Sequence, residues 1–147
     1  MRRDRTLTWF YRLHRGHQAA LLANPHGYVP HSVAVSIAAQ TVRARSNEAV
    51  QHPGRWLLRS FEANLLEDER HRLDDWWDRL LPEVQSALLA CRASQVPREH
   101  REAVLDLMPG GIRAGTDLDE DFEMSGIAAA YLEMVASASA DATSATP

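Results

Sequence analysis

The sequence predicts an all-α protein, a single compact domain of about six helices organised on a long central helix over residues 55–81. Three observations support this prediction. Residues 55–81 contain neither Gly nor Pro, and Pro53-Gly54 and Pro82 bound them. Their apolar residues recur close to every 3.6 positions. The chain has 147 residues and is 45% hydrophobic, which is enough for one globular core.

The first helix is expected over residues 6–23. Phe10, Leu13, His17 and Leu21 form its apolar face, and its arginines lie on another side. Gly16 is a weak point that costs about 1 kcal/mol relative to Ala. Residues 24–31 have the composition of a loop.

Residues 29–38 fit two patterns. Val29, His31, Val33, Val35 and Ile37 alternate as in a β-strand. The alanines between them favour a helix from Ser32 to about Arg45, and no comparable strand is available as a partner. We therefore predict a helix and keep the strand as the alternative.

The central helix is expected to bury a stripe near each end. The stripe consists of Leu58, Phe61, Leu65, Leu73, Trp76 and Leu80. Residues 67–72 between its two parts are all charged or histidine. At 1.5 Å per residue the helix would be about 40 Å long, with a solvated middle.

Prolines predict where the later helices begin. Pro82 fits the first turn of a helix over 82–94, and Pro97 opens another that ends at Pro109. Residues 116–119 resemble a capping box, so the acids at 117–123 should begin a last helix that runs to about residue 136. We predict a domain over residues 1–136. The remaining residues, 137–147, are rich in Ala, Ser and Thr, and we expect them to form a disordered tail.

Composition suggests a cytoplasmic protein. Cys91 is the single cysteine, so no internal disulfide can form, and its apolar surroundings suggest a small buried residue. The apolar segment after Arg3 is too short for a signal peptide, and no run approaches the about 18 residues of a membrane span. We expect no membrane partner.

Charge divides unevenly along the chain. All 16 basic residues are arginine. Residues 1–60 hold nine of them and two acids, a net charge of +7, and the remainder carries −11. Such asymmetry suits a nucleic acid or an acidic protein as partner of the first half. The alternative is that the two halves neutralise each other within the fold.

The basic half supplies candidate contacts to nucleic acid. These are Arg5, Arg12, Arg15, Arg43, Arg45 and Asn47. The first two helices resemble part of a helix-turn-helix unit, in which residues 43–52 would be the recognition helix. Pro53-Gly54 would cut this helix short, and the expected turn has no glycine.

Other constellations carry weaker signals. Glu67, His71 and Asp75 lie at i, i+4 and i+8 on the central helix, as in carboxylate metal sites, although a salt-bridged surface explains them equally. The D-x-D-x-D pattern at 117–121 has Phe122 and Ala128 where a calcium loop needs Gly and Glu. Five of the seven histidines precede residue 55, in no zinc pattern. No nucleophile motif or phosphate-binding loop is present.

These patterns predict a small non-enzymatic regulatory or interaction protein, without a cofactor, whose basic half contacts nucleic acid or an acidic partner. The first alternative is a protein–protein adaptor, or a homo-oligomer, that uses Trp76, Trp77 and the acidic C-terminal half. Adjacent helical positions are 100° apart, so one of these two tryptophans should lie outside the core stripe. A helical metal-carboxylate enzyme is the third hypothesis.

Overall fold

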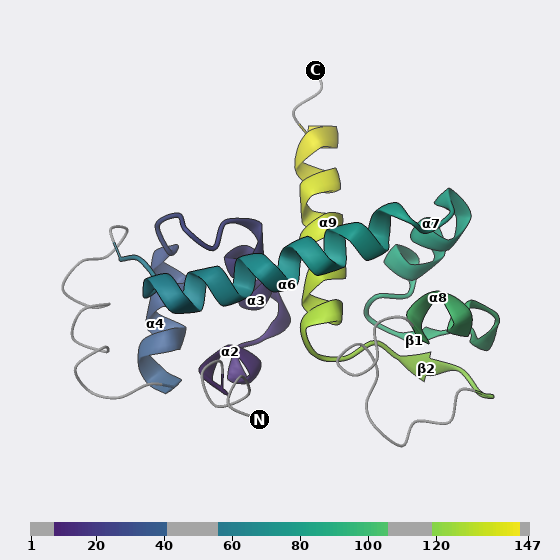
Figure 1. Ribbon diagram of the computed structural model, residues 1–147, viewed down its shortest axis with the longest axis horizontal. Coiled ribbons are helices and arrows are strands. Elements are labelled where there is room, and N and C mark those ends of the chain that lie inside the picture. Colours follow the sequence, from purple (N-terminus) through teal and green to yellow (C-terminus); the bar gives the residue numbers. More distant parts are fainter. Residues whose placement is uncertain (1–7, 41–55, 106–118, 145–147) are drawn as a thin grey trace. The chain divides into compact units, whose positions relative to one another are not determined.

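The computed structural model describes residues 8–40, 56–105 and 119–144, which are mostly helical (Figure 1). The prediction of an all-α fold built on a long helix is confirmed. The chain divides into two compact units, Met1–Glu69 (unit 1) and Arg70–Pro147 (unit 2), and their boundary falls within the helix α6 (Ser60–Asp78). The predicted single domain stays a prediction.

Unit 1 contains α2 (Thr8–Arg12), α3 (Arg15–Ala23), α4 (His31–Gln40) and the first part of α6. Helices α2 and α4 pack against each other. The apolar side chains that are buried in this unit come from every one of its elements. They are Trp9, Phe10, Leu13, Ala19, Leu21, Leu22, Val29, Val33, Ala34, Ile37, Trp56, Leu58, Ala63 and Leu66.

The predicted first helix is broken into α2 and α3. The backbone of His14 is extended (φ −71°, ψ 161°), and its ring accepts a hydrogen bond from the Gly16 backbone N–H. This bond caps the first turn of the new helix α3. The break changes the buried face. Gln18 is buried and donates to the Phe10 carbonyl at 2.8 Å, whereas His17, which was predicted to lie in the core, is only partly buried.

Residues 31–40 form a helix, so the predicted helix is confirmed for this segment and the alternative strand is wrong. Burial does alternate just before α4, where Val29 is buried and its neighbours Tyr28 and Pro30 are exposed. The Val29 N–H donates to the Trp56 carbonyl at 2.8 Å. Residues 56–59 alternate in the same way, with Leu57 and Arg59 exposed. One backbone hydrogen bond therefore joins these two segments, and neither of them is a strand.

Helix α6 is shorter than predicted, and its first part buries a different face. Leu58 precedes the helix, so it does not define the helical phase. Phe61, which was predicted to lie in the core, is 52% exposed, and Leu66 is fully buried instead. Glu62 is also buried, because its carboxylate accepts a hydrogen bond from Trp9 Nε1 at 2.7 Å.

Unit 2 contains the rest of α6, α7 (Pro82–Ala90), η1 (Arg98–His100), α8 (Arg101–Leu105) and α9 (Gly126–Ser144). Pro82 lies in the first turn of α7, as predicted, whereas Pro97 opens a 3-10 turn. The strands β1 (Gln95–Val96) and β2 (Phe122–Glu123) pair antiparallel, with Val96 opposite Phe122 and both side chains buried.

The last helix differs from the prediction at both ends. It begins at Gly126 (φ 60°), and residues 119–123 form a turn and β2 instead of its first turn. The first part of the predicted capping box, residues 116–118, lies outside the described residues. The helix continues to Ser144, beyond the predicted end at residue 136, because its alanine-rich sequence favours propagation once a helix has formed.

The corrected face of α6 gives a stability prediction. Replacing Leu66 with Ala should lower the free energy of unfolding by about 2–5 kcal/mol, because the side chain is fully buried. Replacing Phe61 with Ala should cost less than about 1 kcal/mol. Urea titration measures both values, and an equal loss in the two variants would contradict the assigned face.

Candidate functional site

Exposed aromatic side chains gather in unit 1. Among the described residues, the aromatic side chains with the largest exposure are Tyr11, Tyr28 and Phe61, at 47%, 64% and 52%. Two of them lie close in sequence to an exposed arginine, since Tyr11 precedes Arg12 and Phe61 follows Arg59 by two positions. Unit 1 therefore combines exposed rings with exposed guanidinium groups.

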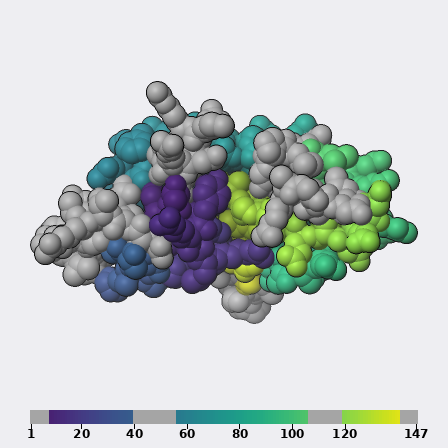
Figure 2. Space-filling view, turned by 90° about the horizontal axis from the view of Figure 1, so that it is seen from below, coloured from purple at the N-terminus to yellow at the C-terminus, as the bar shows by residue number. Residues whose placement is uncertain are grey.

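Helix α2 holds one such combination on its outer face. Trp9 and Phe10 are buried, and the Trp9–Glu62 hydrogen bond fixes α2 to the first turns of α6. Tyr11 and Arg12 consequently point outward, with the Tyr11 ring edge-on to Phe10 at a centroid distance of 5.5 Å. Figure 2 shows this segment, in purple, at the molecular surface. Arg15 follows on the first turn of α3 and is partly exposed.

The two units differ in charge. Unit 1 has nine arginines and six acids, a net charge of +3, whereas unit 2 has seven arginines and 14 acids, a net charge of −7. Two of the acids in unit 1 contact a tryptophan or a histidine side chain. Glu62 accepts from Trp9, and Glu67 pairs with His26 at 2.7 Å. The net charge of +3 follows from the composition of unit 1, and the side chain of Glu67 is 44% exposed at its surface.

Two of the six predicted nucleic-acid contacts lie within the residues that the structure describes. Arg12 and Arg15 flank the α2–α3 break. The other four candidates, Arg5, Arg43, Arg45 and Asn47, lie outside the described residues, as does the predicted recognition segment 43–52. Helices α3 and α4 are joined by residues 24–30, a longer connection than the turn of a helix-turn-helix unit.

The tryptophan pair lies in unit 2 and has a structural role. Trp76 is 2% exposed, and its Nε1 donates to the Ala103 carbonyl at 2.7 Å. Trp77 is partly buried, and its ring lies 5.8 Å from that of Trp76 and 6.2 Å from that of Tyr131. Trp77 is therefore the member of the pair with exposed surface, and Trp76 is not accessible to a partner.

Tyr131 connects α9 to α6 by a short hydrogen bond. Its hydroxyl donates to Asp74 Oδ1 at 2.5 Å, and Arg70 lies 3.7 Å from the same carboxylate. Burial, together with the bond to Asp74, raises the pKa of Tyr131 well above its ordinary value of 10.0. The phenol therefore acts as a neutral donor within unit 2.

The candidate metal ligands do not form a centre. His71 and Asp75 are exposed on α6, and Glu67 is paired with His26. In the described part of the chain, no three His, Cys, Asp or Glu side chains are placed to hold a metal ion. Cys91 is partly buried at the end of α7 and has a free thiol.

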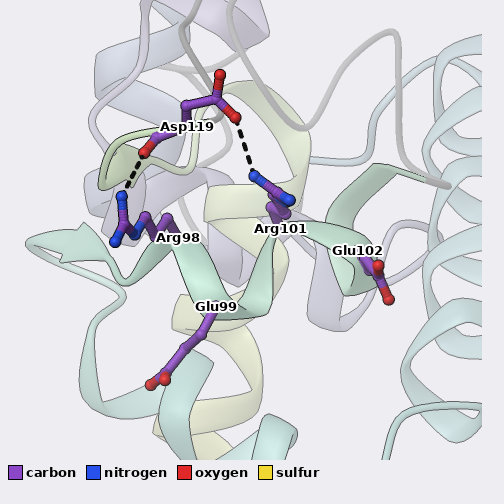
Figure 3. A pocket seen from close by; sticks show the side chains of 5 residues that line it. All are labelled: Arg98, Glu99, Arg101, Glu102 and Asp119. Carbon is purple, nitrogen blue, oxygen red and sulfur yellow. Dashed lines mark hydrogen bonds and ion pairs between the residues drawn. The ribbon is translucent and has the colours of Figure 1, made fainter.

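A polar cavity of about 730 Å³ lies beside η1 and α8 (Figure 3). Arg101 Nη1 donates to Asp119 Oδ1 at 3.0 Å, and Arg98 Nη1 donates to the Asp119 carbonyl at 3.2 Å. The Arg98 backbone N–H donates to Asp121. The acids that were predicted to begin a helix thus hold the segment before β2 against η1. Glu99 and Glu102 also line the cavity, so its described lining holds three carboxyl side chains and two guanidinium groups.

No family model, curated protein or solved structure matches this chain significantly. Within the described ranges, no helix is both long enough and apolar enough to cross a bilayer. The function of the chain must therefore be inferred from the chemistry of its own residues.

The raised pKa of Tyr131 predicts how the protein titrates in alkali. Just above pH 10 the native wild type and Tyr131→Phe should give equal tyrosinate absorbance, because Tyr131 remains protonated in the fold. In concentrated urea the wild type should show one more ionised tyrosine. Since the folded pKa exceeds the unfolded one, the stability from this group is present below pH 10 and is lost above it. A difference between the native spectra would contradict the buried bond.

Proposed function

We propose that this chain is a non-enzymatic nucleic-acid-binding protein that binds single strands through unit 1. The observation that carries the proposal is the combination of exposed aromatic rings and exposed arginines in the unit with excess positive charge. Proteins that bind single strands use aromatic side chains to stack bases and a basic surface to follow the phosphates.

Tyr11 and Arg12 are the central pair in this proposal. They are consecutive and outward-facing on α2, so a base stacked on the Tyr11 ring would have its phosphate within reach of a guanidinium group. Stacking of one base on such a ring contributes about 1–3 kcal/mol. Arg15, at the start of α3, adds positive charge on the other side of the helix break.

The other predicted contacts lie outside the described residues but close in sequence to α2 and α4. Arg5 precedes α2 by three residues in the sequence. Arg43, Arg45 and Asn47 follow α4 by three to seven residues. These residues can add phosphate contacts to those of Arg12 and Arg15.

Single strands suit the exposed side chains better than duplex DNA does. Bases are accessible for stacking only when they are unpaired. The adaptor hypothesis would have to use Trp77, which is only partly exposed, because Trp76 is buried. An acidic protein partner would be attracted by the arginines, but it would leave the aromatic rings unexplained.

The proposal predicts salt-dependent binding to single strands. A fluorescently labelled oligo-dT or oligo-U should bind more tightly than a duplex of equal length, as measured by anisotropy. With five arginine contacts, the slope of log affinity against log salt should be about −3.5, and Arg12→Ala should reduce its magnitude by about 0.7. Tyr11→Ala should weaken binding by about five- to 150-fold without changing the slope.

Two control variants separate binding from folding. Tyr11→Phe keeps the ring and should bind like the wild type. Arg79→Ala removes an exposed arginine from the acidic unit and should leave the salt slope unchanged. Absence of an anisotropy change at low salt with both single strands and duplex would refute the proposal.

A further inference from the structure

The break between α2 and α3 is made by a histidine side chain. His14 Nδ1 accepts a hydrogen bond from the Gly16 backbone N–H at 3.1 Å, and the His14 carbonyl accepts from His17 and Gln18. Asn, Asp and Ser are the usual residues for this position, because each offers an acceptor at any pH near neutral. An imidazole offers an acceptor only while one of its nitrogens is unprotonated.

The His14 ring also stacks on the ring of His17. Their centroids are 3.7 Å apart, with a tilt of 34°. Among the described residues, His17 Nδ1 is a buried nitrogen without a hydrogen-bond partner. A Cβ at position 16 would lie 3.0 Å from His14 Cε1, so the absence of a side chain at Gly16 lets the ring approach the backbone this closely.

Protonation of His14 opposes this arrangement in three ways. The new Nδ1–H cannot accept from Gly16, so the first turn of α3 loses its cap. A positive charge at a helix N-terminus opposes the helix dipole. A second imidazolium at His17 would be repelled across a contact of 3.7 Å.

We propose that the α2–α3 break is a proton-sensitive joint, in which protonation of His14 releases the capping bond and loosens the start of α3. This inference does not depend on the proposed nucleic-acid binding. The joint carries Arg12 and Arg15 on either side of His14, so it lies within the basic surface of unit 1.

The described charged residues next to the joint in sequence are both positive. Arg12 and Arg15 flank the joint and add positive charge, and α4 contributes His31 as its titratable residue. The acids of α6 in this unit are Glu62, Glu67, Asp68 and Glu69. Glu62 accepts from Trp9 and Glu67 pairs with His26.

His17 adds a pH dependence of the same sign. Burial, and then the neighbouring His14, hold the pKa of His17 below its ordinary value of 6.5. The unfolded chain therefore binds this proton more readily than the folded one. The corresponding stability is present above about pH 6.5 and is lost as the pH falls through the lower folded pKa.

The matched test compares His14→Asn and His14→Ala with the wild type by urea titration at about pH 8 and pH 5. Asn keeps a cap that does not titrate, so His14→Asn should match the wild type at pH 8. Between the two pH values the unfolding constant of the wild type should rise about fivefold more than that of His14→Asn. His14→Ala should be less stable than the wild type at pH 8.

Nuclear magnetic resonance on the unmodified chain gives a second readout that requires no variant to fold. The Gly16 amide resonance should shift as His14 is protonated, and the protection factor of the Gly16 amide, which is the exchange rate of an unfolded chain divided by that of this amide at the same pH, should fall. Equal pH dependence in the wild type and His14→Asn would overturn the proposal. A Gly16 amide that does not respond while His14 titrates would overturn it as well.

Discussion

The buried hydrogen bond from Trp9 to Glu62 determines how unit 1 is arranged. A carboxylate removed from water is costly unless it is hydrogen-bonded, and Trp9 Nε1 supplies a donor at 2.7 Å. Because Glu62 faces inward, its neighbour Phe61 faces solvent, and the buried stripe of α6 passes through Leu66. Because Trp9 faces inward, Tyr11 and Arg12 face outward. Tyr11, Arg12 and Phe61 thus lie exposed beside the two residues that this contact joins.

This contact also explains what could be predicted from the sequence. Helical periodicity and Pro82 correctly predicted an all-α fold with a long helix and the start of α7. The phase of α6 was predicted from apolar residues alone, and a buried glutamate contradicts that assumption. The pairing of β1 with β2 joins residues 26 positions apart, Val96 and Phe122, and two-residue strands have no recognisable local pattern.

The basic surface was predicted only in outline. Net charge along the sequence predicted a basic first half, of which the described candidate contacts are Arg12, which is exposed, and Arg15, which is partly exposed. The aromatic component, Tyr11, Tyr28 and Phe61, was missed because large apolar side chains are assumed to be buried. Two of them would have been recoverable from their neighbours, since Tyr11 follows the buried pair Trp9-Phe10 and Tyr28 precedes buried Val29 in an alternating segment.

The arginines of the two units differ in their described contacts. In unit 2, Arg92 pairs with Glu133 and Arg101 pairs with Asp119, so these cations hold elements of their own unit together. Such exposed pairs contribute about 0–1 kcal/mol each, and they serve mainly to orient loops. In unit 1, by contrast, Glu62 and Glu67 are engaged by Trp9 and His26. Over the whole sequence of each unit, the net charge is +3 in unit 1 and −7 in unit 2.

The corner between α2 and α3 is an ordered feature, because its backbone groups have partners. The Phe10 carbonyl accepts from the Leu13 N–H and from the Gln18 side chain, and the Gly16 N–H donates to His14. A frayed helix end would leave such groups to water. Bonds made by Gln18 and His14 hold α2 in a fixed direction relative to α3, which keeps Arg12 and Arg15 on one continuous corner. The same dependence on the His14 side chain is the basis of the proposed proton-sensitive joint.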